Sequence, residues 1–486
     1  MKHLTELLQS ISVLSVYGIT DRSVSSIEND SRVCKENSLF VAIRGTTTND
    51  GHTFIGKAIE NGACTIVCET LPDALQAHCT YVLVNDSREA VALLSNNFYD
   101  FPSDSLRVIG VTGTNGKTTV TYLLKQLLEA TGEKVGLIGT TGNMVGNQLI
   151  PTNYTTPEAP ELFRLLNKMK ESSITTVVME VSSHALVLKR VFGLRFSAAI
   201  FTNLTHDHLD FHGSMDEYSK AKQILFNSLG SNTISILNGD DEFALAMKEE
   251  TKSKVVMCGR DTCNDYQIEN ERLTIEKTEF TLNGQQYTTP LPGRFNIDNV
   301  TLCTALCIEL GIDRELIVGV LTRIKGAPGR METTRLHNGA VAIVDYAHTP
   351  DALEKALGVC AELLEGSSGK LTVVFGCGGN RDILKRAEMG KISKWYADTV
   401  IITNDNPRLE SPQKIIADIV SGISDMESVF IIPDRSEAIE TALKNVKSGD
   451  ILLIAGKGHE NYQIIGTERK YFNDKEEVVK FDSKLK

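Results

Sequence analysis

The stretch Gly110-Val-Thr-Gly-Thr-Asn-Gly-Lys-Thr-Thr119 decides the fold class of this 486-residue chain. An apolar run, LRVIGV at 106–111, leads into it, and a helical pattern at 118–131 follows it. A glycine-rich turn between a strand and a helix is typical of loops that hold phosphates, because the helix N-terminus carries a positive partial charge. The stretch therefore predicts a nucleotide-binding loop within an α/β domain.

Single residues of this loop have definite chemical uses. Gly113 and Gly116 let backbone N–H groups point at phosphate oxygens. Lys117 can reach the β- and γ-phosphates, and Thr118 can place its hydroxyl on Mg²⁺. The common pattern G-x-x-x-x-G-K-[ST] has its first glycine at the position of Val111, so the loop is one residue out of register. The alternative is a glycine-rich turn that exposes a lysine without binding anything.

Apolar runs alternate with helical patterns along the whole chain and predict an α/β fold of three domains. The first domain, 1–105, is a small α/β unit with strands at 39–43, 64–68 and 81–84 and a helix at 87–98. The second, 106–330, has a mostly parallel sheet of P-loop type with further strands at 134–138, 175–180, 198–202 and 233–237, and an antiparallel excursion at 255–290. The third, 331–486, is a Rossmann-like doubly wound sheet with strands at 341–344, 370–375, 399–403, 428–432 and 450–455 and helices such as 352–364 and 436–446.

The composition narrows the class of protein. Net charge is -12 and basic runs are missing, which argues against a nucleic-acid partner. The ten cysteines form no CxxC pair, so we expect buried, reduced thiols. The N-terminus has no signal-peptide pattern, and no window has ~18 consecutive apolar residues. We therefore expect a cytoplasmic protein without membrane insertion.

Two segments rich in carboxylates and histidines follow later strands. Glu180 ends a predicted strand, where open α/β sheets bind ligands, and its oxygens suit Mg²⁺. The segment 201–213, FTNLTHDHLDFHG, holds three histidines and two aspartates within seven residues. A metallo-hydrolase with the pattern H-x-H-x-D-H is one alternative, but Phe211 intervenes before the last histidine and puts the spacing out by one residue.

The runs GTNGKTT at 113–119 and TNLTHDHLDFHGSMDEYSKAK at 202–222 resemble the Mur ligase family, which is related to folylpolyglutamate synthase. Such enzymes use ATP to activate a carboxylate as an acyl phosphate, which an amine then attacks. The resemblance implies a Mg²⁺ cofactor and four catalytic residues: Lys117, Glu180, His208 and Lys222. Lys222 would be carbamylated, which needs a neutral amine and hence a pKa lowered by burial. The metal ligands would be Thr118, Glu180, His208 and the carbamate on Lys222.

The nucleotide site that the resemblance implies draws on several segments. PGRFNIDN at 292–299 and DYAHTP at 345–350 match family segments near ATP. The ATP-binding residues would be Gly113, Thr114, Asn115, Gly116, Lys117, Thr118, Thr119, Asn296, Arg330, Asp345 and His348.

The tetrad Asp405-Asn-Pro-Arg408 resembles the mark of those family members that attach meso-2,6-diaminopimelate. This amino acid has a distal carboxylate that lysine lacks, and Arg408 could hold it through two parallel hydrogen bonds. The residues of this pocket would be Arg381, Asp405, Asn406, Pro407, Arg408, Gly456 and Glu460. The neighbouring stretch 378–390, GGNRDILKRAEMG, departs from the family's usual GGDRDKGKRPLM but keeps Arg381 and Arg386.

The remaining partner would be UDP-N-acetylmuramoyl-dipeptide. NDSRV at 29–33 and LFVAIRG at 39–45 resemble the family's UDP-binding domain, and residues 46–48 would also approach the diphosphate. The residues that bind the sugar nucleotide and its peptide would be Ser31, Thr155, Thr156, Ser182 and Arg190. The resemblance thus implies ligation of meso-diaminopimelate to the D-glutamate γ-carboxylate of this dipeptide by a monomer.

Four alternatives remain open from the sequence. The same ligase could add L-lysine, although Arg408 argues against it. A folylpolyglutamate synthase is disfavoured by the UDP-domain motifs, and the metallo-hydrolase by its histidine spacing. A catalytically dead scaffold is disfavoured because Lys117, Glu180, His208 and Lys222 are all present.

Overall fold

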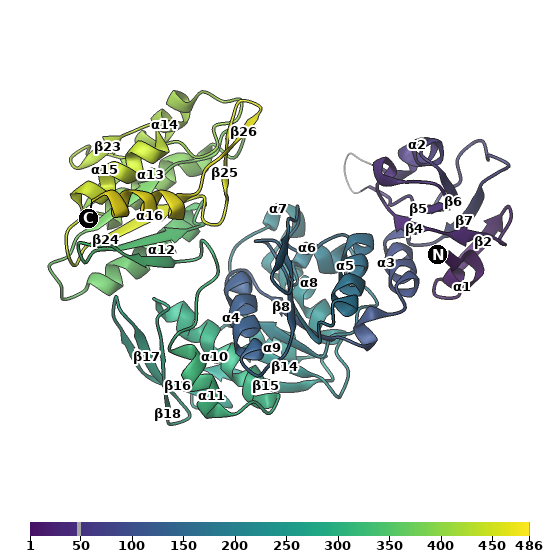
Figure 1. The fold of residues 1–486 in the computed structure, drawn as a ribbon, viewed down its shortest axis with the longest axis horizontal. Coiled ribbons are helices and arrows are strands. Elements are labelled where there is room, and N and C mark those ends of the chain that lie inside the picture. The colour runs from purple at the N-terminus through teal and green to yellow at the C-terminus, as the bar shows by residue number, and fades with distance from the viewer. Residues whose placement is uncertain (46–49, 486) are drawn as a thin grey trace. The chain divides into compact units, whose positions relative to one another are not determined.

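A computed structural model describes residues 1–45 and 50–485, so the predicted diphosphate contacts at 46–48 lie outside the described residues. The chain forms two compact units (Figure 1). Unit 1 consists of residues 1–267 and 302–313, and unit 2 of residues 268–301 and 314–486.

The N-terminal part of unit 1 is a small α/β sheet, as predicted. The strand order is β2-β7-β6-β5-β4, and every pair is parallel except β2 with β7. The strands are β2 (Val13–Tyr17), β4 (Ser26–Glu28), β5 (Ser38–Val41), β6 (Ala63–Cys68) and β7 (Thr80–Val84). The helices are α1 (Leu4–Leu8), α2 (Ile55–Glu60) and α3 (Ser87–Phe98), and a 3₁₀ turn covers Ser31–Val33. Asp86 starts α3 because its carboxylate accepts the N–H of Glu89.

The central part of unit 1 is the predicted parallel sheet. Its strands are β11 (Gln148–Ile150), β10 (Asn143–Val145), β9 (Val135–Ile138), β12 (Thr176–Glu180), β8 (Arg107–Thr112), β13 (Ala198–Phe201), β14 (Ile234–Asn238) and β15 (Lys254–Gly259), in that spatial order. Pairs from β9 to β15 are parallel, and β10 and β11 add an antiparallel hairpin. The phosphate-loop strand β8 lies between β12 and β13, so the ends of these three strands meet at one edge.

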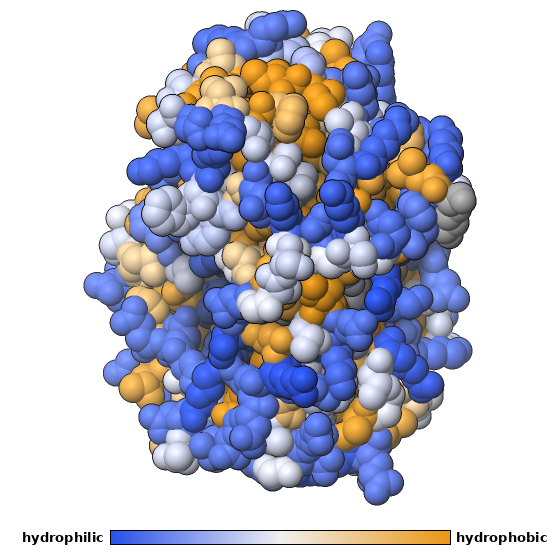
Figure 2. All heavy atoms as spheres, turned by 90° about the vertical axis from the view of Figure 1, so that its left-hand side faces the viewer, coloured by the Kyte–Doolittle hydropathy of each residue, from blue (hydrophilic) through white to orange (hydrophobic). Residues whose placement is uncertain are grey.

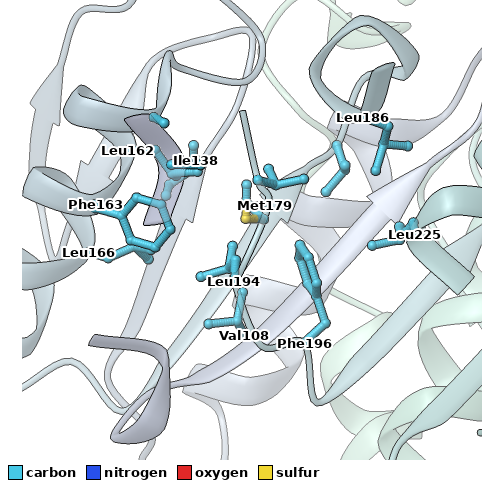
Figure 3. Close-up of a cluster of buried hydrophobic side chains, with 14 of the residues drawn as sticks. Val108, Ile138, Leu162, Phe163, Leu166, Met179, Leu186, Leu194, Phe196 and Leu225 are labelled. Carbon is cyan, nitrogen blue, oxygen red and sulfur yellow. The ribbon is translucent and has the colours of Figure 1, made fainter. Parts of the chain in front are cut away.

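Helices cover this sheet and enclose its core. They are α4 (Lys117–Glu129), α5 (Ala159–Glu171), α6 (Ser183–Val187), α7 (Leu209–His212), α8 (Met215–Asn227) and α9 (Ala244–Lys248). Apolar side chains of α5, including Leu162, Phe163 and Leu166, point toward strand residues such as Ile138 (Figure 3). Each of these four side chains is fully buried, so the core fixes where the strand ends lie.

Unit 2 begins with an antiparallel hairpin, as the pattern at 255–290 predicts in part. Residues 266–267 of β16 (Tyr266–Leu273) still pair parallel with β15, and the rest pairs antiparallel with β17 (Thr278–Leu282), which pairs with β18 (Gln285–Thr289). The prediction was wrong for β15 itself, which is parallel to β14. The helix α10 (Arg294–Glu309) follows, with residues 294–301 in unit 2 and 302–309 in unit 1, and α11 (Arg314–Leu321) belongs to unit 2.

The C-terminal sheet of unit 2 is doubly wound. Its spatial order is β19 (Glu332–Arg335), β20 (Val341–Asp345), β24 (Ile451–Ala455), β21 (Leu371–Phe375), β22 (Thr399–Ile402) and β23 (Val429–Ile431). Only β19 is antiparallel among these strands. The helices are α12 (Pro350–Leu364), α13 (Leu384–Tyr396), α14 (Pro412–Val420), α15 (Arg435–Asn445) and α16 (Asp474–Lys484), and a hairpin of β25 (Tyr462–Ile465) and β26 (Glu468–Tyr471) follows β24.

Alternate side chains of the parallel strands point to opposite faces of the sheet and pack in two separate hydrophobic cores. Leu453 packs with apolar residues of α12, α13 and α14, whereas Leu452 and Ile454 pack with those of α15 and α16. Because both faces are covered, these strands are continuous apolar runs, which is why the sequence locates them. The outer strand β23 exposes Phe430 and Ile431. Figure 2 shows the side of the molecule on which β23 lies in Figure 1. Hydrophobic residues gather near the top of that view.

All ten cysteines are free thiols, and eight of them are buried. Burial raises the pKa of Cys303 well above its ordinary value, and that of Cys307 to about 12. None of the helices that the structure describes has the length and apolar character needed to span a bilayer.

Candidate functional site

The phosphate loop is held by the segment that follows β13. The N–H of Thr114 donates to the carbonyl of Asn203 at 2.8 Å, and the N–H of Asn115 donates to the Asn203 side chain at 2.9 Å. The Thr202 hydroxyl donates to the carbonyl of Asn115 at 2.6 Å. Gly113 has φ +148°, and a Cβ there would lie 1.9 Å from the Thr202 hydroxyl. The loop therefore requires glycine at this position.

Two lysines converge on this loop. The Lys117 ammonium donates to the carbonyls of Gly113 and Thr114, both at 2.9 Å. Lys222 on α8 is buried, and its Nζ donates to the same Gly113 carbonyl at 2.8 Å. Burial, aided by the nearby charge of Lys117, lowers the pKa of Lys222 well below its ordinary value. A lowered pKa favours the neutral amine, which is the form that reacts with CO₂.

Glu180 faces the loop from the end of β12. Its Oε2 accepts hydrogen bonds from the hydroxyls of Thr118 and Thr140, both at 3.1 Å, and its Oε1 accepts the N–H of Thr140 at 2.9 Å. The carboxylate is buried. Hydroxyl and carboxylate oxygens are the donors that Mg²⁺ takes in proteins, so Thr118 and Glu180 fit this ion. Across the described ranges, no three His, Cys, Asp or Glu side chains cluster closely enough to hold a metal by themselves.

The histidine-rich segment lies beside Lys222. His208 has φ +54° and begins α7, and its ring lies 4.9 Å from that of His184 and 6.1 Å from that of Tyr218. The Lys222 ammonium lies 4.4 Å from the same Tyr218 ring. His212 stacks on Tyr218 and shares a 2.9 Å hydrogen bond with Ser183. Tyr218 therefore lies close to both His208 and Lys222.

A chain of hydroxyls leads from Glu180 to the residues expected at the peptide end. Thr140 and Thr155 share a hydrogen bond of 3.0 Å. The Thr156 hydroxyl donates to the carbonyl of Glu180 at 2.9 Å and accepts the N–H of Ser182 at 3.1 Å. Arg190 donates to the Thr156 carbonyl at 3.0 Å and forms an ion pair with Glu158 at 2.7 Å. Four of the five residues predicted for the sugar peptide thus belong to a hydrogen-bonded network that reaches Glu180.

The fifth of these residues, Ser31, lines a separate cavity of about 890 Å³ in unit 1. The lining comes from the N-terminal sheet and from residues 153–164, and it includes Tyr154, Lys57 and Arg164. Arg164 on α5 donates to both oxygens of the buried Glu28 on β4 at 3.1 Å. This ion pair ties the two walls of the cavity together.

In unit 2, the nucleotide residues expected from DYAHTP surround Tyr346. Asp345 accepts the N–H groups of Met331 and Ala347 at 2.7 and 2.9 Å, and burial raises its pKa. The Arg330 guanidinium lies 4.8 Å from the Tyr346 ring, and the rings of His348 and His459 lie 4.6 and 4.9 Å from it.

The last predicted nucleotide residue, Asn296, is buried in the first turn of α10. Its side chain donates to the Pro292 carbonyl at 2.7 Å. Because Asn296, Arg330, Asp345 and His348 belong to unit 2, the structure divides the predicted ATP residues between the two units.

The DNPR tetrad follows β22 and meets the segment that follows β24. Arg408 has φ +54°; its N–H donates to the Ile464 carbonyl at 3.1 Å, and its carbonyl accepts the N–H of Gly466 at 2.8 Å. The Arg408 guanidinium donates to the Gly379 carbonyl at 3.0 Å. Asn406 donates to Glu460 at 3.0 Å.

The other predicted members of this pocket lie around the tetrad. Gly456 has φ +117°, and a Cβ there would lie 3.0 Å from Asp405. A Cβ at Gly379 would lie 1.9 Å from the Pro407 carbonyl, so this turn packs tightly on the tetrad. Arg381 lies in the same turn and is exposed.

Arg386 on α13 holds the two loops of this pocket together. Its buried guanidinium donates to both oxygens of Glu410 at 2.8 Å, to Asp418 at 2.8 Å and to the Gly378 carbonyl at 3.2 Å. Glu410 also accepts the N–H of Asn380 at 3.0 Å. These hydrogen bonds lower the pKa of Glu410 to about 2.

Sequence reasoning missed three polar residues of these sites. Thr140 follows β9 and contacts Glu180, but its sequence context, GTTGN, carries no signal for that role. Gln463 donates to the Asp405 carbonyl at 2.8 Å, and Lys457 contacts three residues of the pocket. Both stand in the run AGKGHENYQ at 455–463, which follows a predicted strand, so their polarity could have marked them.

A phosphate loop after the central strand of a parallel sheet, with a buried carboxylate at the end of the next strand, defines a class of ATP-dependent α/β enzymes. Comparison with known families is consistent across the chain. Residues 23–99 match the Mur ligase family catalytic domain, residues 111–307 the Mur ligase middle domain, and residues 329–458 the Mur ligase glutamate ligase domain. The chain belongs to the Mur ligase family, and its three-domain α/β fold is the one predicted.

Curated relatives match over nearly the full length. A UDP-N-acetylmuramoyl-L-alanyl-D-glutamate–2,6-diaminopimelate ligase of Parabacteroides distasonis is 41% identical over 477 residues, with 98% of each chain covered. A relative of the same name, numbered 1, from Clostridium acetobutylicum is 42% identical, with 99% of each chain covered.

Solved structures agree with this assignment. The structure of another ligase with this name has a TM-score of 0.72 and 32% identity, and covers 100% of this chain and 99% of its own. A folylpolyglutamate synthase of Mycobacterium tuberculosis has a TM-score of 0.61 and 17% identity over 76% of this chain and 92% of its own, a likeness of fold alone.

Proposed function

We propose that this enzyme uses ATP to join meso-2,6-diaminopimelate to the D-glutamate γ-carboxylate of UDP-N-acetylmuramoyl-L-Ala-D-Glu, a step of peptidoglycan precursor synthesis. The observation that carries this is identity of 41–42% over nearly the whole length to ligases named for it. The tetrad at 405–408 supports the choice of amino acid, because it stands after a strand end, includes Arg408 and contacts Glu460 through Asn406.

Activation of the γ-carboxylate comes first. The carboxylate attacks the γ-phosphate of ATP, which releases ADP and leaves an acyl phosphate. Lys117 at the start of α4 offsets the negative charge that develops on the transferred phosphoryl group. Thr118 and Glu180 would hold Mg²⁺, which supplies further positive charge to the phosphates when it is bound. Thr155, Thr156, Ser182 and Arg190 would hold the peptide whose carboxylate reacts, since they belong to the hydrogen-bonded network that reaches Glu180.

Amide formation follows. The amine of diaminopimelate attacks the acyl carbon, phosphate leaves, and the nitrogen loses a proton. We assign no covalent nucleophile of the protein, because positioning and charge suffice for this chemistry. Arg408 would bind the distal carboxylate, and Asp405 and Glu460 the distal ammonium. Lys222 would carry a carbamate, and burial, which lowers the pKa of its amine, favours the neutral form that the carbamate needs.

Ser31 and its cavity would bind the uridine diphosphate end. Arg330, Asp345, His348 and Asn296 would complete the ATP site. We further propose that residues 1–105, 106–330 and 331–486 act as UDP-sugar, ATP and amino-acid domains, and that the enzyme works as a monomer in the cytoplasm.

The test is phosphate release with ATP, Mg²⁺ and UDP-muramoyl-dipeptide, with meso-diaminopimelate and L-lysine compared as acceptors. Turnover with diaminopimelate and little with lysine supports the proposal. Turnover with lysine alone would support ligase activity but would contradict the proposed role of Arg408 in selecting diaminopimelate. Silence with both acceptors would remove the proposed function altogether.

A further inference from the structure

Lys457 lies two residues after the end of β24 and is fully buried, with a side-chain exposure of 0%. Its ammonium donates to Asp405 Oδ1 at 3.3 Å, to Asn406 Oδ1 at 3.2 Å and to Glu460 Oε2 at 3.2 Å. Three donors thus meet three oxygens. All three acceptors belong to the pocket proposed above for the amino acid.

These contacts join two segments that are distant in the sequence. Glu460 Oε2 accepts from both Lys457 and Asn406, and Asn406 Oδ1 also accepts the N–H of Ile464 at 2.9 Å. Lys457 therefore lies at the centre of the contact between the loop after β22 and the loop after β24. Removing its ammonium would take away one donor from each of the three acceptors, two of which, Asp405 and Asn406, are buried.

The cluster of Asp405, Glu460 and Lys457 has a net charge of about one negative unit. Asp405 and Glu460 carry two carboxylates, and Lys457 offsets one of them. The nearby Arg435 is buried and adds no net charge, because it forms a two-fold ion pair with Asp474 at 2.7 Å. This single negative charge is complementary to a ligand with one distal ammonium. The positive charge of Arg408 is complementary to a distal carboxylate.

We propose that Lys457 is a positioning residue that sets the specificity of the amino-acid pocket. It orients Glu460, Asp405 and Asn406 and limits their excess charge to that of one ammonium. The distal group of diaminopimelate is neutral overall, whereas that of L-lysine is a cation. With Lys457 present, the pocket and Arg408 together suit the neutral head; without its charge, the pocket becomes more negative and favours the cation. This inference rests on the function proposed above.

The test compares Lys457→Met with the wild type in full kinetics. Methionine is close in length to lysine and carries no charge. We expect the KM for diaminopimelate to rise at least ~10-fold, with the KM values for ATP and UDP-muramoyl-dipeptide within about twofold of wild type. The ratio of kcat/KM for diaminopimelate to that for L-lysine should fall at least ~10-fold. Lys444→Met, an exposed lysine on α15, is the matched control and should change neither value.

Distinct outcomes decide between the possibilities. Equal loss of kcat/KM for both amino acids would mean a purely structural role and would overturn the inference, as would an unchanged KM for diaminopimelate. If Lys457→Met fails to fold by its thermal unfolding, Lys457→Arg decides: a retained charge should retain the ratio, and a collapsed ratio rejects the idea. A wild-type enzyme that does not turn over diaminopimelate would instead reject the proposed function.

Discussion

At the scale of single residues, the two proposed sites bind ions of opposite charge through charge-assisted contacts. Glu180 and Thr118 in unit 1 offer oxygens to a cation, whereas Arg408 in unit 2 offers N–H groups to a carboxylate. Each contact can be weakened by a substitution that changes only a few atoms, such as Arg408→Lys or Glu180→Gln.

Arg408→Lys keeps the positive charge but loses the two parallel N–H groups. We expect kcat/KM for diaminopimelate to fall about 100-fold, equivalent to ~3 kcal/mol, because a buried carboxylate loses its paired donors. Steady-state kinetics with varied diaminopimelate measure this. Arg335→Lys, an exposed arginine of β19, is the control. An Arg408→Lys enzyme with wild-type kcat/KM would show that the distal carboxylate binds elsewhere.

Glu180→Gln replaces a carboxylate oxygen by an amide of the same shape. The Mg²⁺ concentration that gives half the maximal rate should rise at least ~10-fold, because the neutral amide binds a hard cation more weakly. Rate measured against Mg²⁺ concentration at saturating ATP gives the value. Glu171→Gln, at the exposed end of α5, should leave the curve unchanged. The same curve for Glu180→Gln would remove Glu180 from the metal site.

At the scale of elements, loops after parallel strands make the sites, and their shapes depend on few contacts. The phosphate loop depends on Gly113 and on the segment after β13. The loops of the pocket proposed for the amino acid depend on Arg386 and Glu410.

Gly113→Ala should disable the phosphate loop. The new Cβ would meet the Thr202 hydroxyl at 1.9 Å, and φ +148° suits alanine poorly, so the loop must shift. We expect the KM for ATP to rise strongly and the unfolding free energy to fall by at least ~1 kcal/mol. Gly56→Ala in α2 meets nothing within 4 Å and should be neutral or slightly stabilising. Normal ATP kinetics in Gly113→Ala would contradict the argument.

Glu410 should make stability depend on pH in acid. Its folded pKa, about 2, lies below the ordinary 4.5, so its contribution is present above pH 4.5 and is lost as pH falls toward 2. The melting temperatures of wild type and Glu410→Gln should therefore differ most near neutral pH and converge in acid. Glu388→Gln, an exposed carboxylate of α13, should show no such convergence. A gap that stays constant down to about pH 3 would disprove the link.

The sequence predicts buried elements of this fold well and exposed ones poorly. The strand predicted at 370–375 is β21 at Leu371–Phe375, and the helix predicted at 87–98 is α3 without change. A run buried on both faces is continuously apolar and stands out. The hairpin β25–β26 was missed because Glu468–Tyr471 is exposed and polar, and its pairing depends on tertiary contacts.

The same limit applies to the sites. Motifs at strand ends indicated Lys117, Glu180 and Arg408 because strand order places such ends at one edge. Neither the contact of Thr140 with Glu180 nor that of Lys457 with Asp405 follows from spacing, since each joins segments about 40 or more residues apart. Long-range contacts of this kind need the folded chain.

At the scale of the whole molecule, two compact units with their own cores predict two unfolding transitions. Phe163→Ala removes a core side chain of unit 1, and Leu453→Ala one of unit 2. Each should cost roughly 2–5 kcal/mol and lower mainly one calorimetric transition, a different one for each variant. A single transition that both variants lower alike would mean that the units unfold together.

The division of polar side chains between two sheets also has an evolutionary consequence. The phosphate loop is built on β8 in unit 1, and the tetrad at 405–408 on β22 in unit 2. The residues that hold the phosphate loop come from the segment after β13, and the loops after β21 and β22 contribute none of them. Under the proposed function, a lineage can therefore change the amino acid that it adds while it inherits the phosphate loop unchanged, and a laboratory library confined to the loops after β21 and β22 samples new acceptors with that loop intact.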